Sequence, residues 1–143
     1  MRKLFFLSLA AVLSFGLIQI NTSYAASGDK VVYHVNLGNE QATDALRNIN
    51  NHLAVDPKAK IVVVAHSKGV DFLLQGAEDK NGNPYAGTVA KLAAKGVEFR
   101  VCKITLERRH IDPKRLIPDA KLVPSGVVEV TKLQDEGYAY LKP

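Results

Sequence analysis

Two kinds of apolar pattern alternate along the chain from residue 30 onward. Short runs rich in β-branched and aromatic residues predict strands, at 31–35, 61–65, 97–101, 121–123 and 138–141. Between them, apolar residues at three- and four-residue spacings and stops at Gly or Pro predict helices, at 42–53, 85–95, 104–110 and 127–136. Alternation of this kind favours right-handed crossovers, and therefore a mainly parallel sheet with helices on both of its faces.

The run at 61–65 identifies the middle of that sheet. Ile61-Val62-Val63-Val64-Ala65 has no polar position, as expected of a parallel strand that is buried on both faces. The last predicted strand, Tyr138 to Leu141, is an edge strand. We therefore predict a single α/β domain over residues 26–143, with three layers, α/β/α, and a sheet of about five strands.

The first 25 residues have the pattern of an export signal. Met1-Arg2-Lys3 is basic, Leu4 to Ile20 is mostly apolar and uncharged, and Ser23-Tyr24-Ala25 has the small residues at which signal peptidase cuts. The alternative is an uncleaved membrane anchor, which needs about 20 apolar residues. The apolar run is shorter and is interrupted by polar residues. We predict cleavage after Ala25, a periplasmic or secreted protein, and no membrane association of the mature chain.

Composition and motifs exclude some classes of function. The formal net charge is +5, with the basic residues scattered, and the chain has no Trp, five Tyr and five Phe. A solvated surface explains this better than a nucleic-acid interface does, so no nucleic-acid partner is predicted. Gly-x-Gly-x-x-Gly and Walker patterns are absent from the sequence, so no nucleotide cofactor is predicted, nor any other.

Polar residues occur where three of the predicted strands end: His34 with Asn36, His66 with Ser67, and Cys102. The carboxyl ends of parallel strands meet at one edge of the sheet, where such folds bind their ligands. Ala65 to Gly69 distantly resembles a hydrolase nucleophile elbow, but its first Gly is replaced, and a polar turn is the better interpretation.

A metal is a weak alternative at the same edge. His34, His66 and Cys102 are suitable ligand types for copper or zinc, but their spacing is not diagnostic, and we predict no metal site. His34 could equally be a hydrogen-bonded core residue.

Cys102 is the only cysteine. One interpretation is a buried small hydrophobic residue, which is common for a free cysteine. The other is a reactive thiol, because Cys102 stands between a strand and a predicted helix whose first N–H groups would favour the thiolate. Lys103, and Arg108 or Arg109, would add positive charge. The residue pattern leaves both interpretations open.

A family resemblance favours the second interpretation. An ordered set of segments is similar to the exported, uncharacterised branch of the DsrE/DsrF-like sulfur-relay family, which has the DsrE/TusD-type fold: Tyr33-His34-Val35-Asn36, Val63-Val64-Ala65-His66, Asn81-Gly82-Asn83-Pro84-Tyr85, Gly96 to Cys102 with Leu106, Arg108 and Arg109, and Val123-Pro124-Ser125-Gly126-Val127 with Leu133 to Tyr138. Ser67 is a departure, since relatives usually have Gly after the His.

The resemblance implies a domain that self-associates as trimers or hexamers, and a sulfur carrier or sulfurtransferase in which Cys102 forms a persulfide. Its partners would be sulfur donor and acceptor proteins or small thiols. His66, Lys103, Arg108, His34 and Asn36 are the candidates for binding or for tuning the pKa of the thiol. The alternative is a non-catalytic small-ligand, metal-binding or assembly module of the same fold, whose contacts would include Cys102 and His66.

Overall fold

The computed structural model describes residues 28–143, and the predicted signal peptide lies outside them. Within this range a single sheet has five strands, all parallel, in the order β4-β3-β2-β1-β5. They are β1 Lys30–Val35, β2 Lys60–Ala65, β3 Glu98–Cys102, β4 Ala120–Val123 and β5 Ala139–Leu141. The predicted fold class is confirmed, with β2 in the middle and β5 at an edge.

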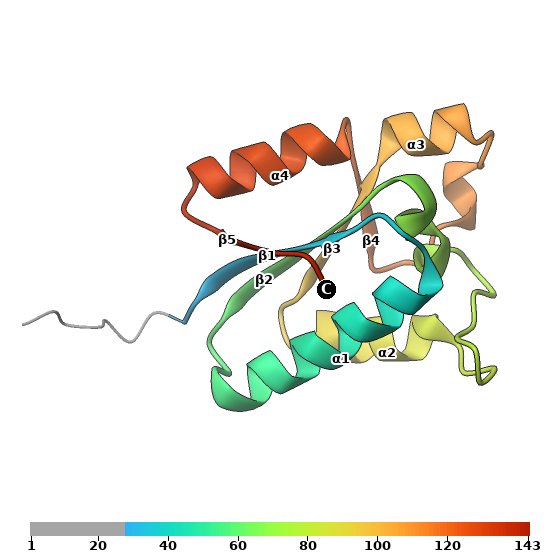
Figure 1. Ribbon diagram of the computed structural model, residues 1–143. Coiled ribbons are helices and arrows are strands. Elements are labelled where there is room, and N and C mark those ends of the chain that lie inside the picture. Colours follow the sequence, from blue (N-terminus) through green and yellow to red (C-terminus); the bar gives the residue numbers. More distant parts are fainter. Residues whose placement is uncertain (1–27) are drawn as a thin grey trace, which may run out of the picture.

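The helices form two layers around the sheet, and Figure 1 shows α4 on one side and α1 and α2 on the other. The helices are α1 Asn39–Val55, α2 Tyr85–Ala93, α3 Lys103–Arg108 and α4 Gly126–Asp135, with the 3-10 helices η1 Ser67–Leu73 and η2 Pro113–Arg115. The predicted boundaries were correct to within a few residues. Among the described helices, none is both long and apolar enough to cross a membrane.

The helix η1 was not predicted, because its polar first half, Ser67-Lys68, has the composition of a turn. The structure buries its second half, with Phe72 and Leu73 in the core. Gly69 allows η1 to lie against the end of β1, since a Cβ atom there would come within 2.1 Å of the Val35 carbonyl oxygen. As a result, η1 begins beside the carboxyl edge of the sheet.

The two faces of the sheet are buried unequally. Alternate residues of β1, such as Tyr33, join Phe72 and Phe99 in a large apolar core beneath α1 and α2. On the other face, a small cluster of Val32, Val62 and Val64 packs against Val130 and Leu133 of α4. This second face also presents polar side chains, of which His34, Arg100 and Cys102 are the ones used below.

Candidate functional site

The carboxyl edge of the sheet opens onto a cavity of about 680 Å³. The strands end in register there, because Val35 pairs with Ala65 and Ala65 pairs with Val101. The cavity is lined by His66, Ser67, Lys68, Cys102, Ile104, Thr105, Arg108, Arg109, Ser125 and Val127. Of the predicted site residues, Cys102, His66 and Arg108 therefore share one cavity.

Cys102 is the last residue of β3 and immediately precedes α3, and it is 5% exposed. Burial by itself raises the pKa of the thiol, because it disfavours the thiolate. Hydrogen bonds outweigh this effect and lower the pKa: the Thr105 hydroxyl donates to the sulfur, and so do the backbone N–H groups of Gly126, Thr105 and Ile104. The sulfur atom thus lies in a pocket of donors that favours negative charge.

The sequence analysis missed Thr105, a buried polar residue on the first turn of α3. The backbone N–H of Ser67 donates to its Oγ1 at 3.0 Å. With that lone pair occupied, the hydroxyl proton is free to point at the sulfur of Cys102. The signal in the sequence was a hydroxyl residue three positions after the cysteine, the spacing at which capping side chains meet.

Gly126, the first residue of α4, was quoted only as part of a family segment. A Cβ atom on this glycine would lie 3.0 Å from the Cβ of His66 and 3.2 Å from the Cβ of Cys102. Both are tighter than ordinary packing allows, so the absence of a side chain lets the α4 N-terminus come close enough for its N–H to reach the sulfur. Gly126 also lies between the cysteine and the histidine.

His34 and His66 face each other directly. Their Nε2 atoms are 2.6 Å apart, and the His34 Nδ1 lies 2.7 Å from the hydroxyl of Tyr140. Burial, followed by the charges of His66 and Lys142, lowers the pKa of His34 from 6.5 to about 4. Burial and Lys142 also lower the pKa of His66. The pair is therefore neutral near pH 7, and either ring can be the donor in the Nε2–Nε2 hydrogen bond.

The remaining candidates lie around the cavity in different ways. Lys103 points along α3 and pairs with Glu107 at 3.5 Å, and it does not line the cavity. Asn36 also lies outside the lining, where its N–H donates to Gln41 at 2.7 Å. Arg109, which was considered only as a nearby cation, donates to the Ser67 carbonyl at 3.0 Å and pairs with Asp71 at 2.7 Å.

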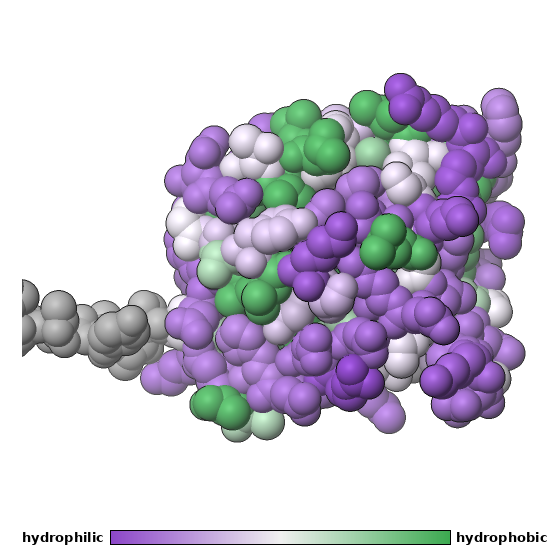
Figure 2. Space-filling view, in the orientation of Figure 1, coloured by the Kyte–Doolittle hydropathy of each residue, from purple (hydrophilic) through white to green (hydrophobic). Residues whose placement is uncertain are grey.

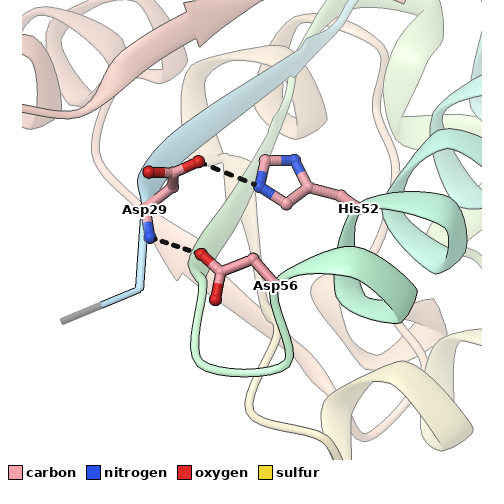
Figure 3. A group of neighbouring side chains, drawn as sticks. All are labelled: Asp29, His52 and Asp56. Atoms are coloured by element: carbon pink, nitrogen blue, oxygen red, sulfur yellow. Dashed lines mark hydrogen bonds and ion pairs between the residues drawn. The ribbon is translucent and has the colours of Figure 1, made fainter. Parts of the chain in front are cut away.

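A metal at the His34, His66 and Cys102 edge has no support from the geometry. Two nitrogen ligands of one zinc ion each bind at about 2.0–2.1 Å, which the 2.6 Å Nε2 separation does not accommodate. Within residues 28–143, the group whose ligand atoms do come together is Asp29, His52 and Asp56 (Figure 3).

That second group lies at the opposite, amino end of the strands, at the start of β1 and the end of α1. Its contacts are structural. Asp56 accepts from the backbone N–H groups of Asp29 at 2.7 Å and Lys58 at 3.1 Å, which fixes the turn into β2. His52 lies 3.7 Å from the Asp29 carboxylate.

Comparisons with known proteins show the family to which the chain belongs. The model of the DsrE/DsrF-like family matches residues 20–143, so the chain belongs to this family. A protein of unknown function from Methanobacterium thermoautotrophicum, MTH1491, has a similar structure, with a TM-score of 0.72 and 31% identity over 80% of this chain and 99% of that one. The ychN protein from E. coli shares the fold, with a TM-score of 0.69 and 19% identity over 80% and 99%. No curated protein sequence matches.

Proposed function

We propose that the protein is an exported sulfur carrier or sulfurtransferase whose Cys102 forms a persulfide. The observation that carries the proposal is the position of Cys102 directly before α3 and against Gly126, the first residue of α4, where donors from both helix starts lower the pKa of a thiol that burial alone would make less acidic. A packed core cysteine does not need such donors. Membership of the DsrE/DsrF-like family supports the same chemistry.

The loading step uses the thiolate as the nucleophile. The Cys102 sulfur attacks the terminal sulfur of a donor persulfide, R–S–SH, a new S–S bond forms as the old one breaks, and R–S⁻ leaves. Cys102–S–SH is the product, and the proton stays on the terminal sulfur. The N–H groups of Gly126, Thr105 and Ile104 stabilise the thiolate before the attack and again after the sulfur is passed on to an acceptor thiol.

The rim of the cavity supports self-association, and the family resemblance implies a trimer or hexamer. Ile104, Val127 and Val128 are apolar and exposed at the starts of α3 and α4. Figure 2 shows apolar side chains among the polar ones over α4. Burial of these side chains against another copy would remove them from water. Light scattering on the mature protein, with and without reductant, tests this: a trimer or hexamer is expected in both, and a monomer contradicts it.

The test of the carrier role is sulfur uptake. The folded mature protein is incubated with a small persulfide donor, and intact mass is measured before and after a thiol reductant. Wild type should gain one sulfur atom, which the reductant removes, and Cys102→Ser should gain none. A wild-type protein that takes up sulfur only after unfolding has a structural cysteine, and the binding or assembly module then replaces this proposal.

A further inference from the structure

Ser67 has a backbone conformation that few side-chain-bearing residues adopt. Its φ is 53°, in the left-handed region that glycine prefers. All of its polar groups are used at the site: the N–H donates to Thr105, the carbonyl accepts from Arg109, and Oγ lies 2.9 Å from the Nδ1 of His66. A glycine could make the first two bonds without strain. The hydroxyl contact to His66 is therefore what the serine adds.

That contact extends the histidine pair into a continuous line. From the cavity outward, Ser67 Oγ meets His66 Nδ1 at 2.9 Å, His66 Nε2 meets His34 Nε2 at 2.6 Å, and His34 Nδ1 meets the Tyr140 hydroxyl at 2.7 Å. Ser67 lines the cavity, and Tyr140 on β5 is 41% exposed. The line thus joins the Cys102 cavity to the protein surface at the edge strand β5.

The hydrogen bonds of this line can all run in one direction or all in the other. In one, Ser67 donates to His66, His66 to His34, and His34 to Tyr140. In the other, every hydrogen bond is reversed. Both leave the two histidines neutral with one proton each, because each ring has one donor and one acceptor nitrogen. A proton that enters at Ser67 therefore converts the first arrangement into the second and releases a proton at Tyr140.

We propose that Ser67, His66, His34 and Tyr140 form a proton relay that takes the proton of the acceptor thiol when the sulfur is passed on from Cys102. The inference rests on the proposed function and adds the route of the proton. The acceptor R–SH gives its proton to Ser67 Oγ, and Tyr140 releases one to water. R–S⁻ then attacks the terminal sulfur of Cys102–S–SH, which gives R–S–SH and the Cys102 thiolate.

The charged groups around the relay are consistent with neutral histidines. Lys142, beyond β5, lowers the pKa of both rings, and burial acts in the same direction. Arg109, which directly follows α3, holds the Ser67 carbonyl. On the α4 side, Arg100 is paired with Glu129, so this carboxylate is already neutralised. The Cys102 thiolate lies across Gly126 from His66.

Two variants test the relay at its ends. Tyr140→Phe removes the exit without touching the cavity lining. Ser67→Gly removes the entry and keeps the positive φ. His110→Gly is the matched control, because His110 also has a positive φ, of 52°, and lies outside the cavity lining. Ser67→Gly and His110→Gly relieve the same backbone strain, so a difference between them reports the hydroxyl.

The measurement is the single-turnover rate of sulfur transfer from loaded Cys102 to free cysteine, as a function of pH, beside the rate of loading. We expect Tyr140→Phe and Ser67→Gly to slow the transfer about a hundredfold, at the low end of what general acid–base groups contribute, at pH values below the pKa of the acceptor thiol. The loss should disappear above that pKa, where the acceptor is already a thiolate. Loading starts from the Cys102 thiolate and does not pass through the relay, so its rate should fall much less than the transfer rate in both variants, and His110→Gly should behave as wild type.

Transfer rates equal to wild type at every pH, or a loss that does not depend on pH and is matched by slower loading, would overturn the relay and leave the carrier role in place. A wild-type protein that never loads overturns the carrier role itself, and the relay with it. The two failures are distinguished by the loading rate of the wild-type protein.

Discussion

The two faces of the sheet differ in what they bury. The face under α1 and α2 is closed by a large apolar core that includes Phe72 and Phe99. The face under α4 has a small valine and leucine cluster and continues into His34, Arg100 and Cys102. The comparison indicates that one face supplies most of the stability. The other tolerates polar groups, because α4 needs only a short apolar stripe to stay attached.

The same contrast explains where the site lies. On the α4 face the starts of two helices, α3 and α4, bring N–H groups to one sulfur atom. On the opposite face the strand ends are covered by η1, whose Phe72 and Leu73 are buried. Substitutions on the α1 and α2 face should therefore change mainly the free energy of unfolding, and substitutions near the α4 N-terminus should change mainly the pKa of Cys102.

The largest expected effect is on stability, from a matched pair of leucines. Leu92 on α2 and Leu133 on α4 are both 1% exposed, one on each face. Leu92→Ala should lower the free energy of unfolding by about 4 kcal/mol and Leu133→Ala by about 2 kcal/mol, because the cost of a cavity depends on the packing around it. Urea unfolding measures both. Equal losses, or a larger loss for Leu133, would contradict the unequal faces.

Gly126→Val should displace α4 from the site. The added side chain would meet the Cβ atoms of His66 and Cys102 at 3.0 and 3.2 Å, so the Gly126 N–H should no longer reach the sulfur. The pH of half-maximal iodoacetamide alkylation should then rise toward about 8.5, the value of an ordinary thiol.

Gly87→Ala is the control, because a Cβ atom there has no neighbour within 4 Å. It should stabilise α2 by up to about 1 kcal/mol and leave the thiol unchanged. If Gly126→Val leaves the alkylation profile as in wild type, the α4 N–H has no part in tuning the thiol.

Thr105→Val removes one donor of the sulfur and keeps the shape of the side chain. The pKa of Cys102 should rise by about one unit, since a hydrogen bond to a charged group contributes about 1.5–3 kcal/mol and backbone donors remain. Thr105→Ser retains the hydroxyl and should restore the wild-type value. The same alkylation titration measures both variants, and identical profiles for Val and Ser would show that the hydroxyl is not a donor to the sulfur.

The last expected effect is the dependence of the free energy of unfolding on pH through His34. The pKa of His34 is lowered from 6.5 to about 4 in the folded protein. As the pH falls through this interval, the unfolded chain binds a proton that the folded one resists, so the free energy of unfolding should decrease. In His34→Gln this part of the decrease should be missing. Urea midpoints of the two proteins at several pH values measure the difference, and parallel curves would contradict it.

The sequence predicted the strands, the α-helices and the meeting of strand ends, because they follow from local patterns. Ile61 to Ala65 identified the central strand, and Cys102 was correctly placed between a strand and a helix. The sequence could not predict that α4 returns to the same edge, because the approach of Gly126 to His66 depends on long-range packing. The direct contact of His34 with Tyr140 likewise requires knowing that β5 pairs with β1.

The pKa of the Cys102 thiol shows most clearly what the sequence could not predict. The sequence predicted tuning by the first N–H groups of the helix after Cys102 and by charge on Lys103 and Arg108. Lys103 pairs with Glu107. The groups that lower the pKa of Cys102 are the predicted N–H groups of Ile104 and Thr105, together with the Thr105 hydroxyl and the N–H of Gly126 from α4, which were not predicted. Backbone N–H groups occur at every position, so only the fold shows which of them reach a given atom.

The most direct test of the account is the alkylation rate of Cys102 in the folded wild-type protein as a function of pH. Because Cys102 is the only cysteine, the label reports a single site. The account predicts an inflection clearly below about 8.5 that is lost when the protein is unfolded. An inflection at or above that value in the folded protein, or no labelling until the chain unfolds, would contradict the claim that these donors make Cys102 a nucleophile.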